Sequence, residues 1–295
     1  MGWAWSVRRV GSCLLVPRAA NKVRKSCPAF RVEGLDSSGI LDETPRSARP
    51  SSNCKGRCCM TEEELKALFD QQAAGYDKQW AGMAPIRNTL YFLLDSLFVG
   101  LPQEARILCV GAGTGAEIAH LAERFPDWRF TALDPSGAML DVCRQRARQG
   151  GFLDRCDFHQ GYLETLEAGQ AYDGATCFLV SQFFTDAQAR TGLFRQIAQR
   201  LKPGGLLANA DLAADTRSPA YERLLHSWMT LMSSAGVDPQ MQERARAAYA
   251  TDVAVLPAQQ VADIIQAAGF AAPVQFFQAG LMHAWICRAD GAGEA

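Results

Sequence analysis

A glycine-rich loop between two apolar runs, within residues 107–136, constrains the fold more than any other feature of the sequence. Residues 107–110 are apolar at every position and stop at a glycine, which is typical of a short strand covered on both faces in a parallel sheet. Residues 117–125 then have the apolar spacing of a helix, and residues 129–133 form a second strand-like run. A strand, a turn, a helix and another strand make one βαβ unit, so the sequence predicts an α/β fold.

The loop points to a nucleoside ligand. Gly111, Gly113 and Gly115 permit positive φ angles and a close approach of the backbone to a ligand. Asp134 follows the second strand, where a carboxylate can accept both hydroxyls of a ribose. Glu117 begins the helix and would compete with a pyrophosphate for the same backbone N–H groups. The pattern therefore favours a nucleoside without phosphates over a dinucleotide.

These residues resemble the class I S-adenosylmethionine-dependent methyltransferases, whose loop is commonly G-x-G-x-G and whose second strand ends in a ribose-binding acid. The resemblance runs from FDQQAAGYD, residues 69–77, to about residue 288. DFHQGYLETL, YDGATCFLVSQFF and RLKPGGLLANADL are similar to the third, fourth and fifth strand regions, and LKPGG is the most specific of these. Its proline and glycines predict a helix that ends at Lys202.

The resemblance implies a Rossmann-like α/β sandwich with a seven-stranded, mostly parallel sheet. QFFQAG and AWICR would form its end, with the last strand inserted antiparallel. The implied cofactor is S-adenosyl-L-methionine, held by the loop glycines and Asp134. Tyr162 stands where many relatives offer an aspartate to the adenine amino group, with Leu163 beneath it, and Phe178 ends the fourth strand near the cofactor. Ordinary core packing is the alternative for all three.

Candidate acceptor-binding residues come from three places, whereas no catalytic residue is assigned. Methyl transfer from a sulfonium mainly requires donor and acceptor to be held in line, so it needs few acid or base groups. Ser181 and Gln182 follow the fourth strand and could orient an acceptor or cap the strand and the next helix. Tyr76 precedes the first strand. Arg246 belongs to an added segment, residues 218–254, that predicts two helices and a lid over the acceptor.

The added segment and the residues after it also have a weak similarity to the carboxy-S-adenosylmethionine synthases of tRNA wobble-uridine modification. An arginine in that family holds the extra carboxylate of the cofactor, and Arg246 matches it by position. A solvated helix residue is the alternative, and the loop GAGTG differs from that family's usual loop. An NAD-dependent oxidoreductase and a non-catalytic cofactor-binding regulator also remain open as functions.

Composition narrows the class of protein further. The 295 residues are 48% hydrophobic and 21% charged with a net charge of −1, the profile of a soluble globular domain without an electrostatic footprint for nucleic acid. LYFLLDSLFVGL is broken by Asp95 and too short to span a bilayer, so it predicts an amphipathic helix and no membrane segment. The histidines and cysteines lack metal-site spacing, and free thiols are expected. Oligomeric state and the identity of the small-molecule acceptor are not set by the sequence.

The first 59 residues differ from the rest. They are basic, with seven Lys and Arg residues before the first acid, Glu33, and residues 37–52 are rich in Ser, Pro and Arg. This composition predicts disorder. An organelle transit peptide is one explanation, and an over-long gene model that should begin at Met60 is the favoured one. We therefore expect a methyltransferase domain over residues 60–290, a tail over residues 291–295, and a cytoplasmic protein, with a mitochondrion or plastid as the alternative.

Overall fold

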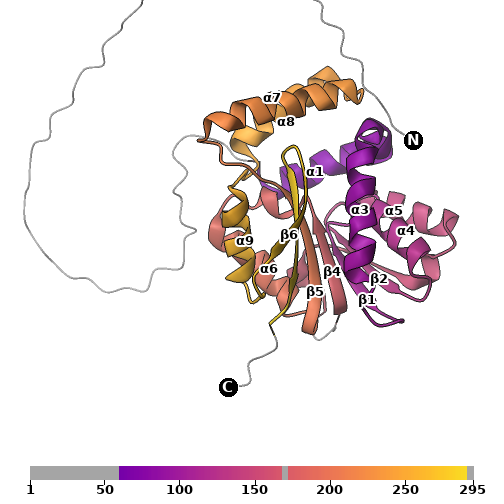
Figure 1. The fold of residues 1–295 in the computed structure, drawn as a ribbon. Helices are drawn as coiled ribbons and strands as arrows, with labels where there is room; N and C mark the ends of the chain where they lie inside the picture. The colour runs from indigo at the N-terminus through magenta and orange to yellow at the C-terminus, as the bar shows by residue number, and fades with distance from the viewer. Residues whose placement is uncertain (1–59, 168–171, 291–295) are drawn as a thin grey trace, which may run out of the picture. The chain divides into compact units, whose positions relative to one another are not determined.

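A seven-stranded sheet lies at the centre of the domain in the computed structural model, which describes residues 60–167 and 172–290 (Figure 1). The strand order is β3-β2-β1-β4-β5-β7-β6. The strands are β1 (Arg106–Val110), β2 (Arg129–Asp134), β3 (Cys156–Gln160), β4 (Tyr172–Phe178), β5 (Leu201–Leu212), β6 (Val274–Ala279) and β7 (Met282–Arg288). Neighbours from β3 to β5 pair in parallel, whereas β7 lies antiparallel between β5 and β6. The predicted sheet and its antiparallel insert are confirmed.

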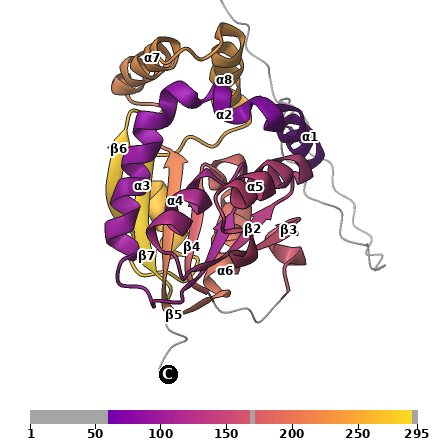
Figure 2. The same cartoon turned by 90° about the vertical axis from the view of Figure 1, so that its right-hand side faces the viewer.

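Helices cover both faces of this sheet (Figure 2). One face carries α3 (Ala84–Phe98), α4 (Ala116–Arg124) and α5 (Gly137–Gln149). The other face carries α6 (Ala187–Ala198) and α9 (Ala258–Gln266). Four short helical elements precede α3: α1 (Glu62–Gln72), η1 (Ala73–Gly75), α2 (Tyr76–Gln79) and η2 (Ala81–Met83). Three more lie in later connections: η3 (Leu153–Arg155), η4 (Leu163–Thr165) and η5 (Ser181–Phe183).

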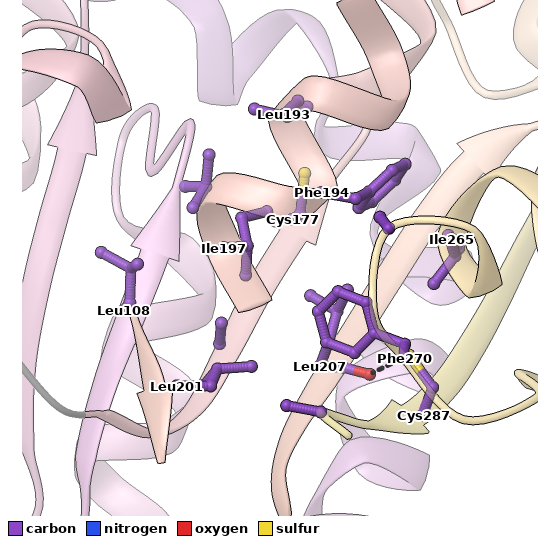
Figure 3. Close-up of a cluster of buried hydrophobic side chains, with 14 of the residues drawn as sticks. Leu108, Cys177, Leu193, Phe194, Ile197, Leu201, Leu207, Ile265, Phe270 and Cys287 are labelled. Carbon is purple, nitrogen blue, oxygen red and sulfur yellow. Dashed lines mark hydrogen bonds between the residues drawn. The ribbon is translucent and has the colours of Figure 1, made fainter. Parts of the chain in front are cut away.

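Two apolar cores, one on each face of the sheet, explain why the first strand is apolar at every position. Leu108 points into the core beneath α6 and α9, where it packs with Phe194, Ile197 and Phe270 (Figure 3). Cys109, the next residue, points into the core beneath α3, α4 and α5. Successive side chains of a strand alternate between faces, so a strand buried on both faces has no polar side.

The amphipathic helix predicted around LYFLLDSLFVGL is confirmed as part of α3. Leu90, Leu94 and Phe98 are buried on one side of it, whereas Phe92 is 71% exposed on the other. No helix among residues 60–167 and 172–290 is long and apolar enough to cross a membrane.

The predicted end of the helix before LKPGG is wrong. That helix, α6, ends at Ala198, and Lys202 already belongs to β5. The reason is sheet pairing, which sequence propensity does not contain: Leu201 pairs with Tyr172, and the register then shifts before Gly174. The proline and glycines therefore lie within an irregular start of the strand.

The added segment forms two helices, α7 (Pro219–Ser234) and α8 (Pro239–Thr251), at the end of the sheet where the parallel strands finish (Figure 1). Both ends of this insertion meet at its base. Ala213 and Leu256 form a parallel bridge, and the N–H of Ala214 donates to the carbonyl of Leu256 over 2.9 Å. The predicted leader and tail, residues 1–59 and 291–295, lie outside the described residues.

Candidate methyl-donor site

The glycine loop follows β1 and requires glycine at all three predicted positions. Gly111, Gly113 and Gly115 have φ angles of 66°, 53° and 73°, in the left-handed region that other residues rarely adopt. A Cβ on Gly111 would also lie 2.3 Å from the side chain of Val180, and one on Gly115 would lie 2.3 Å from Sγ of Cys143. Backbone conformation and close packing therefore both select glycine in this loop.

Asp134 is joined directly to that loop. Its carboxylate accepts a hydrogen bond from the backbone N–H of Gly113 over 2.9 Å and another from that of Ser136 over 2.8 Å. The residue is 8% exposed, and burial raises the pKa of its carboxyl. A carboxylate accepts about four hydrogen bonds, so these two leave acceptor capacity. The loop and the acid meet as the sequence predicts, and the contact with a ribose stays a prediction.

The segment that carries FDQQAAGYD is anchored by its two aspartates, one at the start of α5 and one at the glycine loop. Asp70 accepts a hydrogen bond from the hydroxyl of Ser136 over 2.6 Å. Asp77 accepts one from the hydroxyl of Thr114 over 2.8 Å and forms an ion pair with Arg146 of α5. Sequence reasoning used this motif only for its resemblance. Its two acids, seven positions apart on a helical stretch, were the signal that could have revealed the anchoring role.

Two predicted tyrosines lie close enough to Asp134 for its charge to act on them. Tyr76 is half-buried between the rings of Phe69 and Trp80, and burial, with the charges of Asp77 and Asp134, raises its pKa to about 12. Burial and nearby acids, including Asp134, also raise the pKa of Tyr162, which is 36% exposed. Both phenols therefore stay protonated at neutral pH.

The other two cofactor candidates follow β3 and end β4, two strands that β2 and β1 separate in the sheet. Leu163 is buried in the core beneath α6, next to Tyr162 in the chain. Phe178 is partly buried at the end of β4, and its ring stacks on that of Tyr91 with 6.2 Å between centroids. Their contact with a cofactor stays a prediction.

Leu179, directly after β4, has an unusual backbone conformation. Its φ angle is 59°, the one positive value for a residue other than glycine among residues 60–167 and 172–290. Such a conformation costs roughly 1–3 kcal/mol and tends to occur at functional sites. The bond from its N–H to the carbonyl of Ala210, 2.6 Å long, holds it in place. The strained residue therefore lies directly after β4, next to Val180, which is close to Gly111 of the loop.

Ser181 and Gln182 follow this position, but the structure engages both inside the protein. The hydroxyl of Ser181 donates to a carboxylate oxygen of Asp211 over 2.7 Å and accepts from Nε of Arg190 over 2.9 Å. The side-chain carbonyl of Gln182 accepts from the N–H of Leu212 over 2.8 Å. Both residues are buried, so these bonds give them a structural role, and their contact with an acceptor is untested.

Sequence reasoning missed the ion pair at the centre of this network. Arg190 of α6 and Asp211 of β5 are both 0% exposed, and their nitrogen and oxygen lie 3.0 Å apart. Arg190 also donates to the carbonyl of Ala254, at the end of the insertion, over 3.2 Å. Arg190 occupies the helical spacing of the buried Leu193, Phe194 and Ile197. A charged residue in that apolar series was the available signal.

The lid candidates α7 and α8 close an apolar cluster over the ends of β4 and β5. Trp228 and Met232 of α7 are buried against Leu212 and Leu281, with Leu179 at the edge of the cluster. This apolar cluster also takes in Trp80, Met83 and Phe183. A Cβ on Gly280 would lie 2.4 Å from the Trp228 ring, so the hairpin between β6 and β7 touches α7 without a gap.

Arg246 lies on the exposed side of α8, near Tyr221 of α7; burial and the charge of Glu222 raise the pKa of Tyr221, and the charge of Arg246 opposes them. The structure thus groups the loop, Asp134, Tyr76 and Tyr162, whereas Arg246 lies on α8 outside this group. Within the described part of the chain, no three His, Cys, Asp or Glu residues are grouped as metal ligands. Cys109, Cys143, Cys156, Cys177 and Cys287 are free thiols.

Glu117 is the one charged residue at the loop that departs from its expected environment. It lies in the first turn of α4 as predicted, but its carboxyl turns under the loop and accepts a hydrogen bond from the hydroxyl of Thr176 over 2.6 Å. The residue is 6% exposed. Competition with a phosphate for the loop N–H groups is therefore not its role in this structure.

Comparison with known proteins agrees with this geometry. A family model described as a methyltransferase domain matches residues 107–205, from β1 through the loop and Asp134 to the start of β5. Malonyl-[acyl-carrier protein] O-methyltransferase of Acetivibrio thermocellus is 31% identical over 144 residues, which are 49% of this chain and 47% of that protein. Biotin biosynthesis bifunctional protein BioHC of Teredinibacter turnerae is 31% identical over 216 residues, 68% of this chain and 37% of that protein. The chain thus spans less than half the length of these curated relatives.

Solved structures show the same fold. A putative O-methyltransferase of Nostoc punctiforme superposes with a TM-score of 0.54 at 17% identity, covering 75% of this chain and 60% of that one. The [4+2]-cyclase SpnF superposes with a TM-score of 0.58 at 15% identity, covering 79% of this chain and 98% of that one. The chain therefore contains a methyltransferase domain over residues 107–205 and has the fold of the class I S-adenosylmethionine-dependent methyltransferases.

Proposed function

We propose that the protein transfers the methyl group of S-adenosyl-L-methionine to an oxygen atom of a small-molecule acceptor. The observation that carries the proposal is the hydrogen bond between Gly113 of the glycine loop and Asp134. Both residues lie inside the region that matches the methyltransferase domain model. The named function of the Acetivibrio thermocellus relative, an O-methyltransferase, supports oxygen as the acceptor atom.

The residues of the loop fit this cofactor. Positive φ angles at the three glycines bring the backbone close to a ligand, and Asp134 keeps lone pairs for two ribose hydroxyls. Tyr76 and Tyr162 stand near Asp134 with protonated hydroxyls that can donate hydrogen bonds. The bound cofactor supplies an electrophilic methyl group on a sulfonium. The protein's task is then to hold the acceptor in line with that group and to exclude water.

The apolar cluster beneath α7 supports a closed acceptor side. Trp228 and Met232 are buried there, and the cluster reaches Leu179 at the end of β4. Apolar walls exclude water and strengthen any polar contact made inside them. A carboxylate acceptor would need no general base, because its oxygen is already a nucleophile. Malonyl and related carboxylates are the acceptors to test first, given the name of the Acetivibrio relative.

Ligand binding to the full chain tests the cofactor. In a thermal-shift titration, S-adenosylmethionine and S-adenosylhomocysteine should raise the melting temperature, because a ligand that binds only the folded state stabilises it by mass action. NAD should leave the melting temperature unchanged. Stabilisation by NAD alone would replace the methyltransferase assignment by a nicotinamide enzyme. Binding without product formation, in a mass-spectrometric search of metabolite extracts given labelled cofactor, would favour a regulator.

Replacing Asp134 by alanine is expected to weaken S-adenosylhomocysteine binding by about 2–3 kcal/mol, since two ribose hydroxyls lose their acceptor. The fold should also lose stability, because the N–H groups of Gly113 and Ser136 lose a partner. Asp173→Ala is the matched control: this buried carboxylate accepts a backbone bond from Arg106 over 2.9 Å at the opposite end of the sheet. Calorimetry should find weaker binding for Asp134→Ala only. Equal dissociation constants for both variants would remove the nucleoside assignment.

Replacing Arg246 by alanine tests whether α8 closes on a carboxylate. A charge-assisted hydrogen bond is worth about 1.5–3 kcal/mol, so carboxylated acceptors, or the carboxy derivative of the cofactor, should bind more weakly by that amount. S-adenosylhomocysteine should bind as before. Arg244→Ala, on the same helix and equally exposed, is the control. If both variants bind every ligand like the wild type in calorimetry, Arg246 is a solvated surface residue.

A further inference from the structure

Glu117 is a buried acid with two neutral hydrogen-bonding partners. Thr176 of β4, fully buried, donates to it over 2.6 Å, and the thiol of Cys109 in β1 forms a second bond. Both partners lie in the sheet next to the glycine loop, since Cys109 is two residues before Gly111 and pairs with Thr176. An ionised carboxylate in such a place is costly unless a cation accompanies it.

Among the described residues, no cation acts on Glu117 itself, although the charges of Arg87 and Arg146 act on its neighbours Tyr91 and Cys143. The groups that act on its charge or feel it are Cys109 of β1, Asp134 of β2, Tyr91 of α3, Cys143 of α5, and Thr176 and Cys177 of β4. Asp134 is itself an acid. Burial, opposed by the two hydrogen bonds, raises the pKa of Glu117 to about 7. The carboxyl therefore stands near the midpoint of its titration at neutral pH.

We propose that Glu117 discriminates the methyl donor from its product, an inference that rests on the proposed function. The acid gives up its proton when the sulfonium cation of the donor binds above it. An opposite charge within about 4–6 Å favours the ionised form of an acid. Glu117 lies in the first turn of α4, two residues after Gly115, so a cofactor on the loop would bring its charge to this neighbourhood. Methyl transfer turns the sulfonium into a neutral thioether, and the carboxylate then takes a proton back from solvent.

The proposal assigns Glu117 a specificity-determining role and sets a direction for pH dependence. Below pH 7 the acid is mostly neutral and must lose its proton before it can pair with the cation; above pH 7 it is already ionised. If the cation pairs only with the ionised acid, the apparent affinity scales with the ionised fraction, so affinity for S-adenosylmethionine relative to S-adenosylhomocysteine should rise about tenfold from pH 6 to pH 8. In the ratio of the two affinities, the contributions of contacts that both ligands make cancel.

Calorimetry on the full chain in buffers of different ionisation enthalpy tests this directly. At pH 7, S-adenosylmethionine binding should release about half a proton, whereas S-adenosylhomocysteine binding should release almost none. An analogue with a protonated amine in place of the sulfonium should behave like the donor. Equal proton release for donor and product would overturn the proposal. If neither ligand binds at any pH, the proposed function is what fails.

Two nearly isosteric variants locate the proton. Glu117→Gln has no proton to lose, so its donor-to-product affinity ratio should be flat between pH 6 and pH 8 while product binding is retained. Thr176→Val removes a hydrogen bond that favours the ionised acid, so the midpoint of the ratio should move to higher pH. This second variant keeps the test decisive if Glu117→Gln does not fold. A wild-type pH profile in both variants contradicts the assignment.

Discussion

Arg190→Ala is expected to lower the free energy of unfolding by about 3–5 kcal/mol, because it leaves the carboxylate of Asp211 buried without a counter-charge. Both partners are 0% exposed, and Asp211 also receives hydrogen bonds from Ser181 and from the side chain of Asn209, 2.7 and 2.6 Å long. Those neutral donors cannot replace the lost cation. Urea unfolding of the wild type and of Arg190→Ala measures the difference in the free energy of unfolding.

The matched control for this variant lies on the same helix. Arg195 is exposed on α6, so Arg195→Ala should change the free energy of unfolding by no more than about 0.5 kcal/mol. A loss below about 1 kcal/mol for Arg190→Ala would mean that water reaches the carboxylate of Asp211, so that no buried charge is left without a partner. A destabilised variant should also loosen the loop after β4, where Ser181 and Gln182 depend on Asp211.

Trp228→Ala should lose about 3–5 kcal/mol of packing energy, the usual cost of a large-to-small change at a buried aromatic residue. Trp228 is 4% exposed, its ring touches Gly280, and its Nε1 donates to the hydroxyl of Tyr249 in α8 over 3.2 Å. α7 has three buried residues, whereas none of the residues of α8 is buried. The attachment of both helices therefore depends heavily on this one side chain.

Hydrogen exchange shows which elements lose stability in the Trp228→Ala variant. The amides of α7 and α8 should exchange faster, while those of the central strands should change less, since the lid forms its own apolar cluster. Phe92→Ala, a large aromatic that is 71% exposed on α3, should leave exchange unchanged. Faster exchange throughout the sheet would contradict an independently attached lid. An unchanged α7 would show that Leu225 and Met232 suffice.

The sequence predicts the sheet and the loop because their signals are local. A strand apolar on both sides, such as β1, can only be central, and Gly111 with Asp134 follows from spacing along the chain. Positions whose structure depends on residues far away in the chain could not be predicted in this way. The start of β5 follows from pairing of Leu201 with Tyr172, and the burial of Ser181 follows from Arg190 and Asp211 on two other elements. Secondary-structure propensity predicts neither of these contacts.

The closed base of the insertion bears on how this fold diversifies. Ala213 and Leu256 are bridged, and Ala214 bonds to Leu256, so the chain leaves and rejoins the sheet at nearly one point. A loop whose ends already meet can change length at small entropic cost, about 0.6 kcal/mol for each doubling. Residues 215–255 can thus change in length or sequence while β5, α9 and the glycine loop keep their geometry.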